Sequence, residues 1–405
     1  MTAGVLRLKN PVRHYAWGSR TAIPGLMGLE LPAPEPWAEL WIGAHPAAPS
    51  RVGPEAGSEA LDAFIARDPV AVLGAETARR FHGRLPFLLK LLAAEQPLSL
   101  QAHPDAEQAR QGFARDNARG LAPDAPERCY RDDRPKPELV MALTPFRALN
   151  RFRSPLELAG RLAAIEAPAL EAPLETLRAR PDRAGLAGLF AALWGLGEAE
   201  RGGVLDAAVR WAQRQAPGDA AARCLLELAG LHPQDPAVLA PLLLQLVELQ
   251  PGEAMFLPAG ELHAYLEGTA VEIMGSSDNV LRGGLTSKHV DVDELGRTLT
   301  FASGPVEKLL PRPAGEGVWC WQTPAEEFEL SRIEVRPGRA FRSGAGREVE
   351  ILLCLEGSAV LRGPGEHSIA RGESLLVAAD VPAYAIDGHA TLFRASPGRS
   401  DGPQG

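Results

Sequence analysis

Four side chains from three separate segments have the right types to bind one metal ion: Gln101, His103, Glu138 and His263. Two imidazole nitrogens and two oxygens suit zinc with one coordination position left open for water or substrate. Because side chains alternate between the faces of a strand, Gln101 and His103, two residues apart, would leave a strand on the same face. The residues therefore predict a zinc site in which one strand aims two of the ligands.

The spacing that leads to His263 resembles the second conserved motif of the cupins, small β-barrels that hold a metal between their strands. The motif runs Gly252, five residues, Pro258, one residue, Gly260, two residues and His263. The usual first cupin motif is His-x-His followed closely by Glu. Here Gln101-Ala102-His103 replaces His-x-His, and the glutamate stands far downstream at Glu138. With this departure, the whole chain resembles the type I mannose-6-phosphate isomerases, a zinc-dependent cupin family.

Further motifs in family order carry the resemblance from the N-terminus to about residue 310. They are His-Tyr-Ala-Trp-Gly-Ser at 14–19, Ala-Glu-Leu-Trp-Ile-Gly-Ala-His-Pro at 38–46, Leu-Pro-Phe-Leu-Leu-Lys-Leu-Leu at 85–92 and Ser-Asp-Asn-Val-Leu-Arg-Gly-Gly-Leu-Thr-Ser-Lys at 277–288. Two positions depart from the family. Pro135 stands where the family often has a histidine before Lys-Pro-Glu, so a proton-transfer role for that histidine is absent or moved. Gly283 replaces a usual alanine.

The resemblance implies a reversible isomerisation of D-mannose 6-phosphate and D-fructose 6-phosphate through a cis-enediol, which would feed mannose and GDP-mannose metabolism. It also implies one Zn²⁺ per chain. Such a reaction needs a base, a means of stabilising oxyanion charge and an anchor for the phosphate. Zinc can stabilise the charge as a Lewis acid without redox chemistry.

Four residues are catalytic candidates: Arg282, Lys136, Asp278 and Glu272. The family places its active-site arginine at Arg282, where a guanidinium can neutralise an enediolate or grip a phosphate. Lys136 precedes Glu138 by two residues and would share its face of an extended segment, which suits a proton shuttle. Asp278 is four residues before Arg282 and could instead form a structural clamp with it. Glu272 alternates with apolar residues, so it faces either the site or solvent.

Four more residues are candidates for binding substrate or phosphate: Ser99, Lys90, Lys288 and Glu39. Ser99 is two residues before Gln101 and would lie on the ligand face. Lys90 interrupts an apolar run, and we expect it to face the cavity because a lysine buried without a partner is costly. Glu39, before Leu40-Trp41, poses the same question of inward or outward orientation as Glu272.

The texture of the sequence predicts a mainly β protein, with a jelly-roll catalytic barrel, a helical insertion and a second jelly-roll-like domain. Residues 1–153 and 247–314 are expected to form the catalytic domain, with strands at 39–43 and 87–92 and a helix at 106–119. Residues 154–246 have apolar positions at helical spacing, and this helical pattern continues through 238–246. Residues 315–398 are expected to form the C-terminal domain, with strands at 328–335, 349–355 and 373–378.

The C-terminal domain contains a degraded copy of the motif around His263. With an offset of 120 residues, Gly252-Glu253 aligns with Gly372-Glu373, and His263 aligns with Ala383. Alanine offers no lone pair to a metal. We therefore expect a second barrel that binds no zinc, in which His367 and His389 are solvated.

Composition limits the partners. The formal net charge is −9 and no basic run of five residues occurs, which argues against nucleic acid and leaves a phosphorylated substrate to local cations. The chain has no apolar run of about eighteen residues and no signal-peptide pattern at its start, so we expect a cytoplasmic protein without a membrane partner. The four cysteines lack a CxxC spacing. We expect a monomer or weak homo-oligomer.

Two other classes of function remain open. A metal-dependent cupin oxygenase would use iron, but Gln101 replaces one histidine of the ligand set that favours Fe(II). A non-catalytic sugar-phosphate sensor would keep the fold, yet Lys136, Asp278 and Arg282 are all present.

Overall fold

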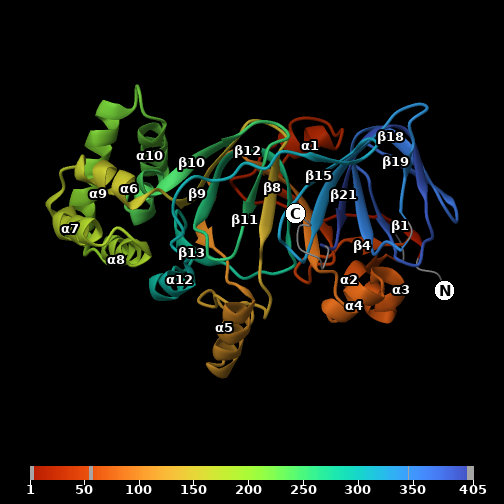
Figure 1. Ribbon diagram of the computed structural model, residues 1–405, viewed down its shortest axis with the longest axis horizontal. Coiled ribbons are helices and arrows are strands. Elements are labelled where there is room, and N and C mark those ends of the chain that lie inside the picture. Colours follow the sequence, from red (N-terminus) through yellow and green to blue (C-terminus); the bar gives the residue numbers. More distant parts are fainter. Residues whose placement is uncertain (1–3, 54–57, 345, 399–405) are drawn as a thin grey trace.

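Three bodies follow one another along the longest axis of the computed structural model, which describes residues 4–53, 58–344 and 346–398 (Figure 1). A β-barrel lies in the centre, a group of helices packs at one end, and a second β-structure forms the other end. The prediction of a mainly β cupin fold with a helical insertion is confirmed.

The central barrel is a ten-stranded sheet among the described residues. Its main path runs β10 (Leu244–Leu249), β9 (Phe146–Phe152), β12 (His263–Gly275), β6 (Phe87–Ala94), β3 (Glu39–Gly43) and β2 (Val12–Arg13). Four further strands of this sheet pair outside this path: β7 (Leu100–Ala102), β8 (Glu138–Ala142), β11 (Ala254–Leu257) and β13 (Leu281–Gly284). The first half of β12 pairs with β7 and β9, and its second half pairs with β6 and β8. The strands predicted at 39–43 and 87–92 are confirmed as β3 and β6.

The helices at one end are α6 (Pro155–Ala163), α7 (Glu171–Ala179), α8 (Arg183–Trp194), α9 (Glu198–Gln215), α10 (Ala220–Leu231) and α11 (Ala240–Leu243). Side chains of Ser154, Asp182 and Asp219 accept backbone N–H groups at the starts of α6, α8 and α10, which explains where these helices begin. The helical pattern predicted through residue 246 is wrong at its end, because strand β10 starts at Leu244. A short leucine-rich run fits a buried helix and a buried strand equally well.

Shorter elements complete the fold. They are α1 (Ala22–Leu26), α2 (Leu61–Arg67), α3 (Pro69–Leu73), α4 (Ala75–Arg80), α5 (Ala106–Ala118), α12 (Val292–Thr298), β4 (Arg51–Val52) and β5 (Glu59–Ala60), with 3₁₀ turns at Pro168–Leu170 and Pro236–Leu239. The helix predicted at 106–119 is α5, which starts with a capping box formed by Asp105 and Gln108.

The C-terminal body is a nine-stranded sheet among the described residues. Its path runs β1 (Val5–Leu8), β20 (Ser374–Val377), β18 (Glu350–Arg362), β21 (Ala385–Ser396), β16 (Glu329–Val335), β15 (Val318–Trp321) and β14 (Arg312–Gly315), and it also includes β17 (Phe341–Arg342) and β19 (Glu366–Ala370). Strand β1 comes from the start of the chain, yet it pairs with β20. The domain limits therefore stay a prediction. Residues 1–153, expected to belong to the catalytic domain, contain β1, a strand of the C-terminal sheet.

The 120-residue offset relates two equivalent pieces of backbone. Strands β11 and β20 coincide under it, and the turn before each has the same hydrogen bond. Glu253 Oε2 accepts from Gln250 N at 2.9 Å, and Glu373 Oε2 accepts from Ala370 N at 2.8 Å. The last residue of β11 pairs with Glu138, as the last residue of β20 pairs with Glu350.

Two apolar cores tie the three bodies together. One contains residues of the helical end together with barrel residues such as Leu149 and Leu281. Another joins the two sheets, for instance Leu89 and Val271 of the central barrel with Ile351 and Phe393 of the C-terminal sheet. The central barrel is therefore supported on both sides.

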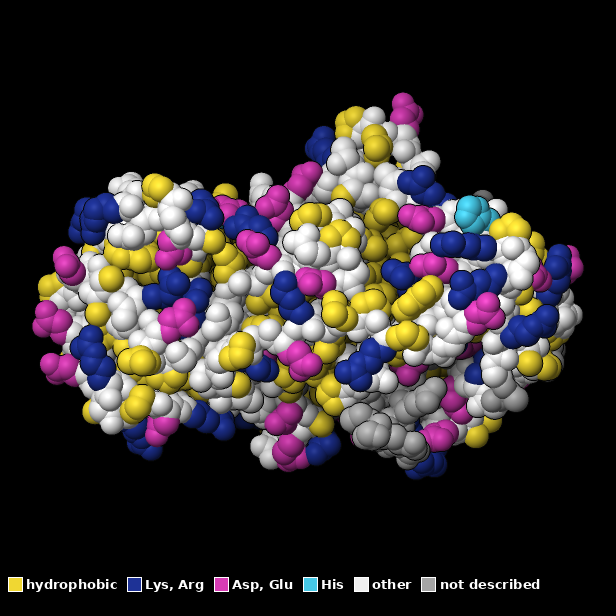
Figure 2. Space-filling model, turned by 45° about the horizontal axis from the view of Figure 1, so that its top comes forward, with side chains coloured by type: hydrophobic (Ala, Val, Ile, Leu, Met, Phe, Trp, Pro, Cys, Tyr) yellow, Lys and Arg dark blue, Asp and Glu magenta, His cyan; other side chains and the backbone are white. Residues whose placement is uncertain are grey.

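The surface carries charges of both signs. On the face drawn in Figure 2, acidic and basic side chains alternate over all three bodies. Among the described residues, no helix is long and apolar enough to cross a membrane.

Candidate active site

The three charged or imidazole ligands predicted from the sequence converge in the central barrel. His103 follows β7, Glu138 begins β8, and His263 begins β12. One ligand atom from each lies within 4.8 Å of the others, and all three side chains are buried. His103 Nε2 is 3.2 Å from Glu138 Oε1, and His263 Nε2 is 3.5 Å from Glu138 Oε2.

The outer hydrogen bonds of the two histidines fix which nitrogen faces the centre. His103 Nδ1 donates to the carbonyl oxygen of Asn279 at 2.7 Å, and His263 Nδ1 donates to that of Glu261 at 2.9 Å. Each Nε2 therefore carries an unprotonated lone pair that faces the carboxylate of Glu138. Among the described residues, His103 Nε2 has no hydrogen-bond partner. Acceptors that face one another need a cation between them, so this group fits a metal ion.

Gln101 lies beside this group. Its side-chain amide lies 3.5 Å from His263 Nε2, and Ser99 Oγ donates to Gln101 Oε1 at 3.5 Å. Gln101 also pairs with His263 in the sheet. All four predicted ligands are thus brought together, with Ser99 on their side as expected.

The electrostatics keep these ligands ready for a metal. Burial, together with the nearby Lys136, lowers the pKa of His103 to about 4, so its ring is neutral at pH 7. Burial alone would raise the pKa of Glu138, but the nearby Lys136 outweighs it and holds that pKa well below its ordinary value. A neutral imidazole and an ionised carboxylate are the forms that bind metals.

Gly260 explains part of the motif around His263. Its φ is +74°, and an added Cβ would lie 2.8 Å from the carbonyl oxygen of Thr298. Its N–H donates to the carbonyl oxygen of His103 at 2.8 Å. A residue with a side chain would strain this contact, so glycine ties the two histidine segments together.

A second buried cluster surrounds Lys90. Its Nζ lies 2.9 Å from Glu272 Oε2 and 3.4 Å from Glu39 Oε1, while Tyr265 donates its hydroxyl to Glu272 Oε1 at 2.9 Å. Glu272 and Glu39 therefore both face inward. Burial opposes the charge on Lys90, but Glu272 and Glu39 outweigh it and raise the pKa of that lysine. Lys136 is also buried, with Nζ 3.0 Å from Glu138 Oε1.

Cations gather around Arg282. Its guanidinium forms no hydrogen bond or ion pair with another described residue. Burial first, and then Arg131, lower the pKa of Arg282. Burial, Arg282, Arg131 and Arg13 lower the pKa of Lys288. The alternative of a clamp between Asp278 and Arg282 is wrong, because Asp278 Oδ1 instead lies 3.6 Å from His45 Nε2.

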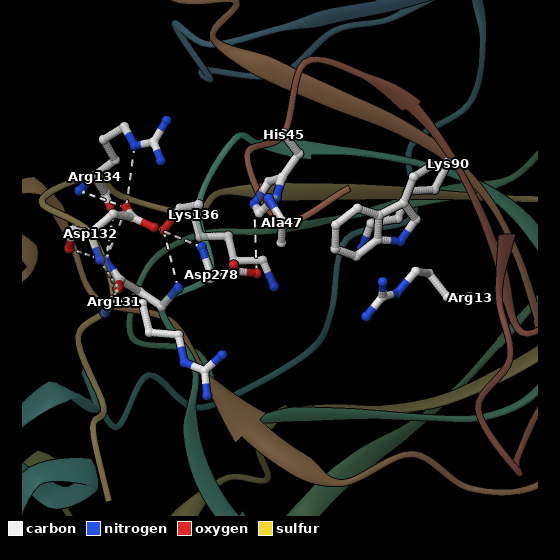
Figure 3. A network of polar contacts seen from close by, with 12 residues as sticks. Arg13, His45, Ala47, Lys90, Arg131, Asp132, Arg134, Lys136 and Asp278 are labelled. Carbon is white, nitrogen blue, oxygen red and sulfur yellow. Dashed lines mark hydrogen bonds and ion pairs between the residues drawn. The ribbon is translucent and has the colours of Figure 1, made fainter. Parts of the chain in front are cut away.

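Several residues at the site were not predicted from the sequence. Asn279 is buried, accepts Arg131 N at 2.7 Å and Asp132 N at 3.1 Å, and donates to the carbonyl oxygen of Asp132 at 2.8 Å. Figure 3 shows Arg131, Asp132 and Arg134 on one side and His45 above Asp278. His45 and Asn279 lie within the quoted motifs at 38–46 and 277–288, which were the available signal.

Comparisons with known proteins agree with this geometry. Residues 5–155 match the model of the phosphomannose isomerase type I catalytic domain. A mannose-6-phosphate isomerase from Escherichia coli K12 is 40% identical over 393 residues, which cover 96% of this chain and 98% of that protein. The chain belongs to the mannose-6-phosphate isomerase family.

Other mannose-6-phosphate isomerases extend the match. The protein from Bos taurus is 32% identical, over 93% of this chain and 94% of its own length. A zinc-bound mannose 6-phosphate isomerase structure has a TM-score of 0.89 and 37% identity, covering 98% of this chain and 100% of that one. A variant of the Salmonella typhimurium enzyme has a TM-score of 0.90. The predicted resemblance to the family is confirmed.

Proposed function

We propose that this chain catalyses the zinc-dependent, reversible isomerisation of D-mannose 6-phosphate and D-fructose 6-phosphate. The observation that carries the proposal is the group of His103, Glu138 and His263, whose acceptor atoms face one another around a place for a cation. Gln101 adds a fourth ligand, and one Zn²⁺ per chain is expected. Bound there, zinc would supply Lewis-acid stabilisation of developing oxyanion charge.

The reaction moves protons between neighbouring atoms. A proton leaves C2 of the open-chain aldose, a cis-enediol forms, and a proton returns to C1 while the hydroxyl proton moves from O2 to O1. We assign proton transfer to Lys136, buried beside Glu138, and to Asp278, whose carboxylate is 34% exposed. Glu272, the remaining catalytic candidate, is held by hydrogen bonds from Lys90 and Tyr265.

The phosphate would bind at the cluster of cations. Arg282 and Lys288 were assigned from the sequence, and Arg131 and Arg13 extend the same positive region. The charge of Lys90 is already balanced by Glu272 and Glu39, so we place Lys90 and Glu39 in the sugar cavity and not at the phosphate. The net charge of −9 makes such a local cluster necessary for an anionic substrate.

A coupled assay for fructose 6-phosphate formed from mannose 6-phosphate tests this function. Zinc-loaded protein should turn over mannose 6-phosphate, lose activity after chelation and recover it with added zinc. Unphosphorylated mannose should be a poor substrate because the cations would have no partner. Zinc-loaded protein that makes no fructose 6-phosphate would contradict the proposal. Oxygen uptake with iron would then favour an oxygenase, and tight binding without turnover would favour a sensor.

The proposal extends to the setting of the enzyme. We place it in the cytoplasm, where sugar phosphates are made and feed mannose and GDP-mannose metabolism, as a monomer or weak homo-oligomer. We assign activity to residues 1–153 and 247–314, with 154–246 as the helical domain and 315–398 as a domain without metal. Light scattering coupled to size exclusion would measure the oligomeric state.

A further inference from the structure

His45 is a buried histidine beside the site that has no role as a ligand. It lies in the turn after β3, where its carbonyl oxygen accepts Ala48 N at 3.0 Å. Its side chain is 2% exposed. A buried imidazole usually satisfies both nitrogens, so the partners of this ring indicate what it does.

The ring has one satisfied nitrogen and one unsatisfied nitrogen. Ala47 N donates to His45 Nδ1 at 3.3 Å, so Nδ1 is an acceptor and the proton of the neutral ring is on Nε2. Among the described residues, Nε2 has no hydrogen-bond partner. The carboxylate oxygen Oδ1 of Asp278 lies 3.6 Å from this nitrogen (Figure 3).

The imidazole is held in this direction by an aromatic neighbour. Trp41 packs against it in a T-shaped arrangement, with ring centroids 4.9 Å apart. Trp41 is itself fixed, because its Nε1 donates to Glu39 Oε2 at 2.8 Å. The ring therefore cannot readily turn its Nε2–H toward another acceptor.

Asp278 is fixed at its backbone and free at its carboxylate. Its N–H donates to Asp132 Oδ2 at 2.8 Å. Its carboxylate accepts no hydrogen bond from another described residue, and its side chain is 34% exposed. A movement of about 0.5 Å would bring Oδ1 to a normal hydrogen-bond distance from His45 Nε2.

We propose that His45 is a positioning residue, which donates from Nε2 to Asp278 and holds that carboxylate oriented toward the substrate. The inference rests on the proposed function, because it acts through Asp278.

A neutral donor suits this task. Burial lowers the pKa of His45 to about 4, although Asp278 favours the charged form. The other charged groups that face the ring are Lys90 from β6, and Arg134 and Asp132 from the segment before β8. A cation at this place would pair permanently with Asp278, as Lys90 does with Glu272. A neutral N–H orients the carboxylate without neutralising it.

The first test compares His45→Leu with His45→Gln. Leucine removes the donor, whereas the amide nitrogen of glutamine can reach the position of Nε2. We expect His45→Leu to lower kcat about 10- to 100-fold, the range for a hydrogen bond to a charged group, with KM changed less than about threefold. His45→Gln should recover most of the turnover.

The second test asks whether His45 acts through Asp278. The double variant His45→Leu with Asp278→Asn should be no slower than Asp278→Asn alone. Zinc content should stay at one per chain in each, and His232→Leu, on the distant helical end, serves as the matched control. The inference would be overturned if the losses of turnover in the two single variants multiplied in the double variant. It would also be overturned if His45→Leu lost zinc, or if His45→Gln were as slow as His45→Leu.

Two outcomes separate this inference from the proposed function. Wild-type protein without isomerase activity would refute the function itself. Normal turnover of Asp278→Asn would overturn the inference while leaving the isomerase activity established. If His45→Leu does not fold, ¹⁵N NMR of the wild-type protein can still identify the tautomer of the His45 ring. Its signal is assigned by comparison with the spectrum of His45→Gln. The Nε2–H tautomer is expected, and an Nδ1–H tautomer would refute the inference.

Discussion

Glu138 and Glu350 occupy equivalent places in two barrels and have opposite surroundings. Each is the first residue of its strand, β8 or β18, and each pairs with the last residue of the equivalent strand, β11 or β20. Both carboxylates are buried, at 1% and 4% exposure. The backbone frame is therefore the same, and the neighbouring side chains make the difference.

In the central barrel, Glu138 faces the lone pairs of two imidazoles. In the C-terminal barrel, Glu350 accepts a hydrogen bond from Tyr384 OH at 2.7 Å and one from Arg394 Nη1 at 3.2 Å, with Arg347 Nη1 at 3.6 Å. The donors that surround Glu350 are attached to the chain and already present. Glu138 also has a cation of the chain beside it, Lys136, whose Nζ lies 3.0 Å from Oε1. The imidazole lone pairs that face Glu138, however, require a cation from outside.

The difference shows how one strand arrangement serves either chemistry or stability. A buried carboxylate needs positive charge nearby, whichever group supplies it. A metal can leave a coordination position for substrate, whereas guanidinium groups fill the space and offer no open position. We infer that the C-terminal barrel contributes packing, and the central one catalysis.

The largest effect should follow from removing an imidazole. His103→Ala and His263→Ala should each lose tight zinc binding and nearly all activity, because the remaining oxygen-rich set is a poor zinc site. Elemental analysis of purified protein measures this directly. Full zinc occupancy in either variant would refute the ligand assignment and remove one side of the comparison.

Replacing the other carboxylate should affect stability and not metal. Glu350→Gln leaves Arg394 and Arg347 buried without their anion, which we expect to cost about 3–5 kcal/mol of unfolding free energy. Zinc content should remain at one per chain. Urea denaturation measures the loss. A variant as stable as wild type, or one that loses zinc, would show that the two carboxylates do not have separate roles.

The two barrels also differ in how their arginines are used. Arg282→Ala should reduce turnover by the equivalent of about 2–4 kcal/mol while keeping zinc and fold, because its guanidinium is free to stabilise substrate charge. Arg394→Ala is the matched variant and should lower stability while the zinc-bound enzyme keeps its activity. Near-normal kcat in Arg282→Ala would give that arginine a structural role.

A smaller effect should follow at Tyr384, which donates to Glu350. Tyr384→Phe removes one hydrogen bond to a charged group, and we expect a loss of about 1.5–3 kcal/mol. Thermal unfolding of variant and wild type at equal zinc loading measures it. An unchanged midpoint would mean that the two arginines suffice for Glu350.

The smallest effect should come from the histidines of the C-terminal barrel. His389 is exposed and His367 is partly exposed, and neither is near Glu350 in the hydrogen-bond network. His367→Ala and His389→Ala should leave zinc at one per chain. Two zinc ions in wild type, with the second lost in either variant, would end the distinction between the barrels.

Much of the site could be predicted because its metal ligands occur in short motifs that combine unusual residue types. Gln-x-His, Lys-Pro-Glu and the Gly–Pro–Gly–His spacing carried the four ligands, and short apolar runs located β3 and β6. These are local patterns, and each specifies its residues without knowledge of distant segments.

Contacts between distant segments could not be predicted. The pairing of Glu272 with Lys90 depends on the register of β12 against β6, and a single sequence does not reveal which strands meet. The approach of His45 to Asp278 depends on two loops at different barrel edges. The orientation of Glu272 stayed open for the same reason.

The pairing of β1 with β20 sets the order in which the protein can be completed during synthesis. Val5 pairs with Val377, so β1 waits until the distant segment that contains β20 has left the ribosome. At the usual pace of translation this interval is on the order of 20–70 s. Throughout it, the backbone edge of Val5–Leu8 has no partner from its own sheet. Until β20 has been synthesised, the exposed edge of β1 must therefore be kept from pairing with a wrong strand.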